Sequence, residues 1–361
     1  MCDQQGRIIT LTRETESAGH VVRLKNRAML PGLVNAHSHA FQRVIRGRTE
    51  RRTSAHDSFW TWREMMYSAA MRLEPEEIYD ASRMAFLEMA LGGITAVGEF
   101  HYIHRAPDGS PYMDANLMAK EVIRAARDVG LRIALLRVAY ARSGYKLKPN
   151  ERQLRFLEAN AEEYLRNADS LKTELARTEP ETAWIGLAPH SVRAVPLEYL
   201  RAVARYAEGE ESMPLHMHVA EQPAEISACM EEHGLTPVEF LNSENLLSPN
   251  FTGVHAIHIT PEEARKLARA RAMVCACPTT ERNLGDGIVP AEMLFAEGVT
   301  ISLGTDSHTQ IDLLEDAREL EYHLRLQKLE RAVLAPADDD SLSALARQLF
   351  DCATVNGARS I

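Results

Sequence analysis

The sequence predicts an α/β protein whose main body is a (β/α)8 TIM-like barrel, with a small, incomplete β-sandwich layer from the two ends of the chain. Eight apolar runs alternate with longer segments of helical periodicity, and eight parallel strands are the number that closes such a barrel. Histidine and aspartate residues gather at the carboxyl ends of these runs, where the active sites of such barrels lie.

The expected strands and helices follow one another along the chain. Near-continuous apolar character is typical of parallel strands, which are buried on both faces. The expected strands are residues 33–40, 95–102, 132–140, 184–191, 214–221, 251–259, 272–280 and 300–307. Apolar residues three and four apart predict helices between them, at residues 74–91, 114–129, 196–206, 261–269 and 311–326.

The two ends of the chain are the segments that the barrel does not use. Residues 1–29 contain one short β-like stretch, and we expect them to form a partial β-sandwich segment. Residues 30–345 would form the barrel, and residues 346–361 would begin a return to the β-sandwich that is cut short. The sequence has no internal repeat and no linker rich in Pro, Gly or Ser, so we expect no second independent domain.

Composition is that of an ordinary globular protein with an acidic balance. The 361 residues include 41 Lys and Arg against 51 Asp and Glu, a formal charge of -10. This charge argues against a nucleic acid or an acidic membrane as the partner, and favours a small molecule. An anionic substrate would therefore need arginines of its own inside the site.

The first residues lack the apolar core of a signal peptide, and no run approaches the 18 or so apolar residues of a membrane span, so we expect a cytoplasmic protein. Five cysteines at unpatterned spacings argue against a disulfide framework. Cys275 and Cys277 could be soft metal ligands, but small thiols within a buried strand are the commoner case.

The strand ends supply a candidate metal centre. His37 and His39 are two residues apart, so in a strand their side chains point the same way. His218 could add a third imidazole and Asp306 a carboxylate from across the barrel. An ion with an open coordination position lowers the pKa of water toward neutrality, and Asp306 could accept its proton.

Two neighbours could complete the chemistry. Glu221 follows His218 by three residues and could carry protons to a leaving nitrogen, if the site raises its pKa. His255 could polarise the electrophile, whereas we expect His216 and His258 to be packing residues or supports. Each of these residues taken alone is more often structural, and it is their joint occurrence at strand ends that favours a metal site.

Six segments in a fixed order identify a resemblance. They are HAFQR, DSFWTWREMMY, EFHYIH, APHSVRAVP, HVAEQ and CPTTERNLGDG, and GTDS follows after the eighth expected strand. With PGLVNAHSHAFQR at the first strand, the sequence resembles the amidohydrolase superfamily and, within it, the formimidoylglutamate deiminases. The similarity runs from about residue 7 to the last residue.

The resemblance implies a function and a site. The metal ligands would be His37, His39, His218 and Asp306 around one Zn2+ per chain, although Fe2+ or Mn2+ would accept the same ligands. Glu221, His255 and Asp306 would be catalytic, and the substrate would be bound by Gln42, Arg63, Tyr102, His190 and Arg193. The implied reaction hydrolyses N-formimino-L-glutamate to N-formyl-L-glutamate and ammonia in histidine degradation, and the resemblance also allows a homodimer.

The residues themselves leave alternatives open. Two guanidinium groups suit the two carboxylates of this substrate, but Arg63 taken alone is more often a surface helix residue. A related deaminase for a purine-like or guanidino substrate would need aromatic stacking and amide contacts instead. An inactive metal-binding barrel would hold zinc and release no ammonia, and a purely structural barrel would bind no metal.

Overall fold

The chain separates into two compact units, Met1–Pro31 and Gly32–Ile361. The structure is a computed structural model, and it describes residues 2–3, 8–12, 21–51, 58–147, 150–158, 160–210 and 213–361. Among the described residues of the first unit, the β structure is one isolated antiparallel bridge between Cys2 and Ile8. Much of the expected segment 1–29 lies outside the described residues, so its β-sandwich character stays a prediction.

The second unit is an eight-stranded parallel sheet in which the strands follow one another in chain order from β1 to β8. Its strands are β1 Leu33–Ser38, β2 Ile94–His101, β3 Arg132–Ala139, β4 Ala183–Pro189, β5 Leu215–Val219, β6 Phe251–His255, β7 Met273–Ala276 and β8 Ile301–Leu303. A parallel bridge between Ser38 and Asp306 joins the last strand to the first. The predicted barrel and all eight of its strands are confirmed.

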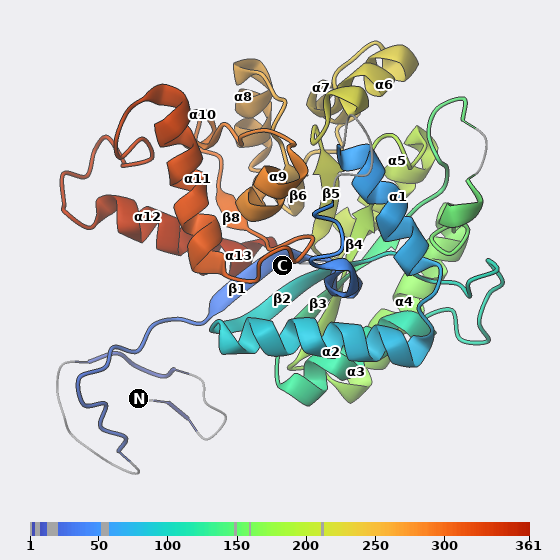
Figure 1. The fold of residues 1–361 in the computed structure, drawn as a ribbon, viewed down its shortest axis with the longest axis horizontal. Coiled ribbons are helices and arrows are strands. Elements are labelled where there is room, and N and C mark those ends of the chain that lie inside the picture. Colours follow the sequence, from blue (N-terminus) through green and yellow to red (C-terminus); the bar gives the residue numbers. More distant parts are fainter. Residues whose placement is uncertain are drawn as a thin grey trace. The chain divides into compact units, whose positions relative to one another are not determined.

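Helices surround the strands of this unit (Figure 1). They are η1 Ala40–Ile45, α1 Phe59–Ala70, α2 Pro75–Leu91, α3 Leu117–Val129, η2 Glu151–Gln153, α4 Ala161–Thr178, α5 Leu197–Glu208, α6 Pro223–His233, α7 Pro237–Ser243, α8 Pro261–Ala270, α9 Pro278–Leu284, α10 Ala291–Ala296, α11 Leu313–Lys328, α12 Ala344–Cys352 and α13 Val355–Ser360. All five predicted helices are present. In the described part of the chain, every helix is too short or too polar to cross a membrane.

Local sequence explains where these helices begin. Prolines at the first turn fix φ for α2, α6, α7, α8 and α9. At α8, the Thr260 hydroxyl accepts from the Glu263 backbone N–H, and the Glu263 carboxylate accepts from the Thr260 N–H, which forms a capping box. Helices α6, α8 and α9 begin within six residues of the ends of β5, β6 and β7, so these starts fix where the chain leaves those strands.

The end of the chain differs from the expectation. Residues 346–361, expected to begin a return to the β-sandwich, form the larger part of α12 and all of α13. The reason is that Leu345, Leu349 and Cys352 are spaced three and four residues apart and pack toward the barrel core, which suits a helix. The C-terminus lies beside β1 (Figure 1).

Helix α13 covers the amino end of the barrel. The Ser360 carbonyl accepts a hydrogen bond from His216 Nε2 at 2.7 Å, and the Ile361 carbonyl accepts from Trp184 Nε1. Asn356 donates to the Ile301 carbonyl at 2.9 Å. These partners lie at the starts of β5, β4 and β8, so the opposite, carboxyl end of the barrel is the end where polar side chains are left to form a site.

Candidate metal centre and active site

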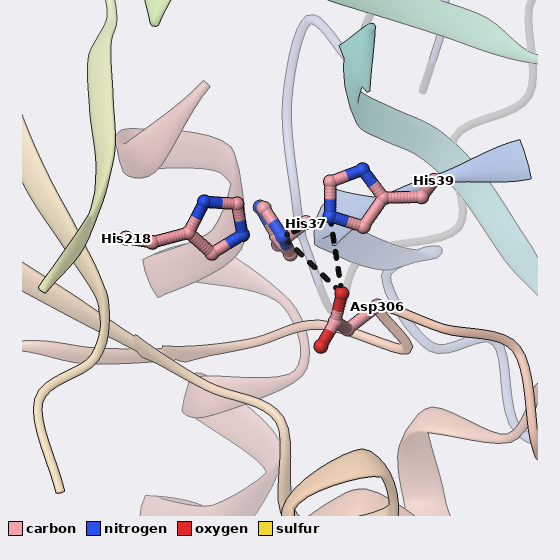
Figure 2. Close-up of side chains that lie close together, drawn as sticks. All are labelled: His37, His39, His218 and Asp306. Carbon is pink, nitrogen blue, oxygen red and sulfur yellow. Dashed lines mark hydrogen bonds and ion pairs between the residues drawn. The ribbon is translucent and has the colours of Figure 1, made fainter. Parts of the chain in front are cut away.

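Four predicted metal ligands meet at the carboxyl end of the barrel. His37 lies in β1, His39 immediately follows it, His218 lies in β5, and Asp306 follows β8. All four are buried, and their ligand atoms lie within 4.8 Å of one another. Figure 2 shows the three imidazole rings gathered around one point with the Asp306 carboxylate. The structure therefore brings together the complete predicted ligand set.

The ring nitrogens face one another closely. Nε2 of His37 lies 3.2 Å from Nε2 of His39, and the Asp306 Oδ1 lies 3.5 Å and 3.2 Å from these two atoms. The Nδ1 atoms of His39 and His218 lie 2.9 Å and 3.2 Å from the carbonyl oxygens of Phe100 and His190. Carbonyls only accept, so Nδ1 carries the hydrogen in both rings and the Nε2 lone pairs point inward.

This donor set fits a divalent metal ion. Burial lowers the pKa of His37 to about 3, and the neighbouring imidazoles His39 and His255 add to the effect. Burial also lowers the pKa of His218 well below its usual value. His37 and His218 are therefore neutral at pH 7, and inward lone pairs with a carboxylate beside them are what Zn2+ and similar ions require.

Asp306 is held in an unusual backbone conformation. Its φ is 44°, in the left-handed region that residues other than Gly seldom adopt. Burial alone would raise the pKa of its carboxyl group, but the neighbouring imidazoles of His37 and His39 hold that pKa well below the usual value. Asp306 is thus a carboxylate at pH 7, available as a ligand and as a proton acceptor.

Glu221 and His255 lie beside this cluster. His255 Nε2 is 3.7 Å from Glu221 Oε1 and 3.8 Å from Asp306 Oδ2. Burial would lower the pKa of His255, but Glu221, Glu281 and Asp306 together raise it well above its usual value. Burial raises the pKa of Glu221, the direction that a proton carrier at neutral pH needs.

Glu281 is a functional neighbour to which sequence reasoning gave no role. Its Oε1 lies 3.2 Å from His255 Nδ1 and accepts from the Cys277 backbone N–H at 2.9 Å. The residue lies in α9, within the segment CPTTERNLGDG that supported the resemblance, but spacing alone does not place it against β6. It fixes the ring of His255 from the side away from the metal cluster.

Cys277 lies close to His255 and Glu281 but is a poor ligand. Burial raises the pKa of its thiol well above the usual value, and the neighbouring Cys275 raises it further. Metals bind thiolates, so a thiol kept protonated favours the interpretation of a packed core side chain. The described cysteines are all free.

All five predicted substrate-binding residues line one cavity, together with His39, His218, Glu221, His255 and Asp306. Within it, Gln42 donates to the Tyr102 hydroxyl at 3.0 Å, and His190 Nδ1 lies 3.2 Å from the Ser191 hydroxyl. Arg193 donates to the Ser143 carbonyl at 3.0 Å. The metal cluster and both arginines therefore face the same space.

Arg63 is not the surface helix residue that it would most often be. It lies in α1 with its guanidinium carbon 4.4 Å from the Trp60 ring centre and 5.4 Å from the Tyr67 ring centre. Its Nε is buried and has no hydrogen-bond partner among the described residues. Tyr67 and Tyr140 line the cavity as well, and sequence reasoning did not select them. Tyr67 could have been found from the sequence, because residues four apart in a helix, such as Arg63 and Tyr67, lie on the same face.

His216 and His258 lie apart from the metal cluster, as expected of packing residues. His216 faces the amino end of the barrel, where it hydrogen-bonds the Ser360 carbonyl. His258 Nε2 lies 3.0 Å from the Asp286 carbonyl and holds the loop that follows α9.

Comparisons with known proteins agree with this geometry. Residues 28–361 match the model of the amidohydrolase family. A formimidoylglutamate deiminase of Pseudomonas aeruginosa is 38% identical over 335 residues, which is 92% of this chain and 72% of that protein. An 8-oxoguanine deaminase of the same species is 30% identical over 304 residues, 83% of this chain and 64% of that protein.

Solved structures show the same architecture. An amidohydrolase from Brucella melitensis superposes with a TM-score of 0.85 at 37% identity, over 91% of this chain and 72% of that one. A mutant atrazine chlorohydrolase of Arthrobacter aurescens, complexed with zinc and atraton, gives a TM-score of 0.73 at 25% identity, over 92% of this chain and 70% of that one.

Proposed function

The chain belongs to the amidohydrolase family and is a hydrolase of C–N bonds, and from this premise we propose that it hydrolyses N-formimino-L-glutamate to N-formyl-L-glutamate and ammonia. The same proposal assigns it to histidine degradation, where this compound is an intermediate. A cytoplasmic location and a homodimer stay predictions from the sequence.

One observation carries the proposal. A single cavity contains carboxylates beside the His37, His39, His218 and Asp306 cluster and also two guanidinium groups, Arg63 and Arg193. The substrate has the matching charges, since its amidine is cationic at neutral pH and its two carboxylates are anionic. In a protein with a formal charge of -10, these arginines supply the local positive charge that an anionic substrate requires.

Zinc is the metal that we propose. Imidazole nitrogens and carboxylate oxygens are ligands that Zn2+ binds in proteins, and the atrazine chlorohydrolase relative was solved with zinc. When bound, the ion would lower the pKa of water and polarise the amidine. The ligands would be His37, His39, His218 and Asp306, and Fe2+ or Mn2+ could occupy the same set.

The surrounding residues have separate tasks in this proposal. Asp306 accepts a proton as water adds to the formimino carbon, and Glu221 donates a proton to the nitrogen that leaves as ammonia. His255 donates from Nε2 and stabilises the tetrahedral intermediate. Arg63 and Arg193 bind carboxylates, while Gln42, Tyr102 and His190 orient the amidine end of the substrate.

Ammonia release from N-formimino-L-glutamate by the purified, zinc-loaded protein tests the function. N-formimino-L-aspartate, guanine and a chelated sample serve as comparisons. We expect release from the glutamate compound alone, and its loss after chelation. Release from guanine instead would favour a purine-like substrate, and one zinc per chain with no release from any substrate would indicate an inactive metal-binding barrel.

Two variants test the assigned roles. Glu221→Gln removes the proton carrier at constant shape, so kcat should fall by about 100-fold or more. Arg193→Met removes one carboxylate contact, so kcat/KM should fall by about 10- to 100-fold. Full turnover in the first variant, or unchanged KM and kcat/KM in the second, would contradict the corresponding role.

A further inference from the structure

A buried glutamine lies behind two tyrosines of the cavity wall. Gln153 Nε2 donates to the Tyr67 hydroxyl at 2.8 Å and to the Tyr140 hydroxyl at 2.7 Å. Gln153 is 2% exposed and Tyr67 and Tyr140 are 3% and 1% exposed. Both tyrosines line the cavity that contains Arg63 and Arg193, so this bridge lies at the edge of the proposed substrate site.

The direction of these hydrogen bonds follows from their neighbours. The Asn150 backbone N–H donates to the Ser143 hydroxyl at 2.9 Å, so the hydroxyl proton is free to donate elsewhere. It donates to Gln153 Oε1 at 2.6 Å. The amide oxygen is thereby occupied and the amide NH2 faces the two phenols, which must both accept.

Because the Tyr67 and Tyr140 hydroxyls accept hydrogen bonds from Gln153, their own protons remain available to donate to another group. The Tyr67 and Tyr140 hydroxyls both lie against the Gln153 amide, so at most one of their two protons can be shared between them. The other proton has no acceptor among the described residues. Two guanidinium groups lie nearby, since the guanidinium carbon of Arg63 is 5.4 Å from the Tyr67 ring centre and Arg193 lines the same cavity as both tyrosines. This wall of the cavity offers donors only, which suits an anion.

The glutamine is held in place by an anchored segment. In residues 150–158, Arg155 donates to the Arg105 carbonyl at 2.8 Å and Phe156 is fully buried. Ser143 connects the glutamine to one of the arginines. Its hydroxyl orients Gln153, and its carbonyl accepts a hydrogen bond from Arg193 at 3.0 Å. The phenols are therefore oriented before a ligand arrives, which lowers the entropic cost of binding.

We propose that Gln153 is a positioning residue that turns the Tyr67–Tyr140 pair into a hydrogen-bond donor for a substrate carboxylate, beside Arg63 and Arg193, and so sets the preference for dicarboxylates. This inference rests on the proposed function for the identity of the substrate. It predicts that the tyrosine pair discriminates between a carboxylate and a neutral group at the same position.

The test compares substrates that differ in one carboxylate. N-formimino-L-glutamine replaces the side-chain carboxylate, and N-formimino-4-aminobutyrate lacks the α-carboxylate. For wild type, Tyr140→Phe and Gln153→Met, we measure kcat/KM for N-formimino-L-glutamate relative to each analogue. One of the two ratios should fall by about 10- to 100-fold in both variants, because one charge-assisted hydrogen bond is lost. The analogue whose ratio falls identifies the carboxylate.

Further variants separate donation from simple support. Gln153→Glu keeps the shape but accepts from both phenols, so the ratio should fall at least as far as in Tyr140→Phe. Tyr199→Phe is the matched control, because Tyr199 is buried, its hydroxyl has no partner among the described residues, and it does not line the cavity. Its ratios should equal those of wild type.

Ratios that stay within about twofold of wild type in Tyr140→Phe would overturn the inference, since one lost charge-assisted hydrogen bond costs more. Should Gln153→Met fail to fold, the ratio measured for Tyr140→Phe decides whether the inference stands.

If wild type releases no ammonia from N-formimino-L-glutamate, the proposed function fails. Calorimetric titration with glutarate then tests directly whether the tyrosine pair binds a carboxylate. About tenfold weaker binding in Tyr140→Phe would support the inference. Equal binding, or none to wild type, would overturn it.

Discussion

Substitution of Glu281 tests whether the orientation of His255 matters for turnover. Glu281 is 2% exposed, and one of its oxygens lies 3.2 Å from His255 Nδ1 and 2.9 Å from the Cys277 backbone nitrogen. Glu281→Ala removes the acceptor for two buried donors. Glu281→Gln keeps an oxygen acceptor of the same shape and removes only the charge.

The size of the effect follows from these contacts. Each buried donor left without a partner costs about 1–3 kcal/mol, so Glu281→Ala should lower the free energy of unfolding by about 2–6 kcal/mol. A lost hydrogen bond to a charged group is worth about 1.5–3 kcal/mol, so kcat should fall by about 10- to 150-fold if His255 acts only in the held orientation. For Glu281→Gln, both kcat and the free energy of unfolding should lie between the values for Glu281→Ala and wild type.

The measurements are kcat for ammonia release at saturating substrate, thermal stability, and zinc per chain. Glu263→Gln is the control, because Glu263 is also buried and also accepts from a backbone N–H, at Thr260, outside the cavity. A kcat within about twofold of wild type in Glu281→Ala, with zinc retained, would refute the positioning of His255 by Glu281, because the lost bond should cost more.

Three further outcomes follow from the structure. Removing the metal with a chelator should abolish ammonia release. It should also lower the free energy of unfolding, by about 4 kcal/mol if zinc is normally present at 1,000 times its Kd. Added zinc should restore the first in an ammonia assay and the second in an unfolding titration. Gly304→Ala should lower the zinc bound per chain by about half or more, because the new Cβ would lie 2.7 Å from His37 Cβ and would displace that side chain. Gly209→Ala is the control and should leave the zinc content unchanged, because its new Cβ would meet no atom closer than 3.5 Å. Arg137 outweighs the effect of burial and lowers the pKa of Glu158 from 4.5 to about 2, so this carboxylate stabilises the fold above pH 4.5 by about 3 kcal/mol and loses that contribution as the pH falls toward 2. The difference in urea stability between wild type and Glu158→Gln should accordingly be large at pH 6 and shrink toward pH 2.

The positions of the strands could be predicted from the sequence, because runs of apolar residues indicate buried strands. The residues at which the strands end could not be predicted. The expected fifth and sixth strands ran to residues 221 and 259, whereas β5 and β6 end at Val219 and His255. Ala220, His255 and Ala256 have φ values of 52°, 74° and 50°, outside the β region, so neither strand continues past these residues. The backbone leaves the sheet where the catalytic candidates begin, and hydrophobicity does not report that change.

The cluster of His37, His39, His218 and Asp306 could be predicted because strand alternation and barrel topology place these side chains together. Residues that support them come from elements distant in sequence, and no spacing relates the partners. Glu281 lies 26 residues from His255, and Gln153 lies 86 residues from Tyr67. The segment of Gln153 follows β3 without apolar periodicity, so nothing in the sequence indicated that it returns to the cavity wall.

Barrel closure and the candidate metal centre depend on the same hydrogen bonds between the first strand and the segment after the last, here called the seam. The Asp306 N–H donates to the His37 carbonyl at 3.1 Å, and the His39 N–H donates to the Asp306 carbonyl at 3.1 Å. Asn35 adds two side-chain hydrogen bonds to Thr305, at 2.7 Å and 3.0 Å. Three of the four candidate ligands, His37, His39 and Asp306, thus come from the two segments that this seam joins. Because the seam sets the separation of these ligands, an ion bound between them would in turn hold the first strand against the last, and binding and closure should stabilise each other.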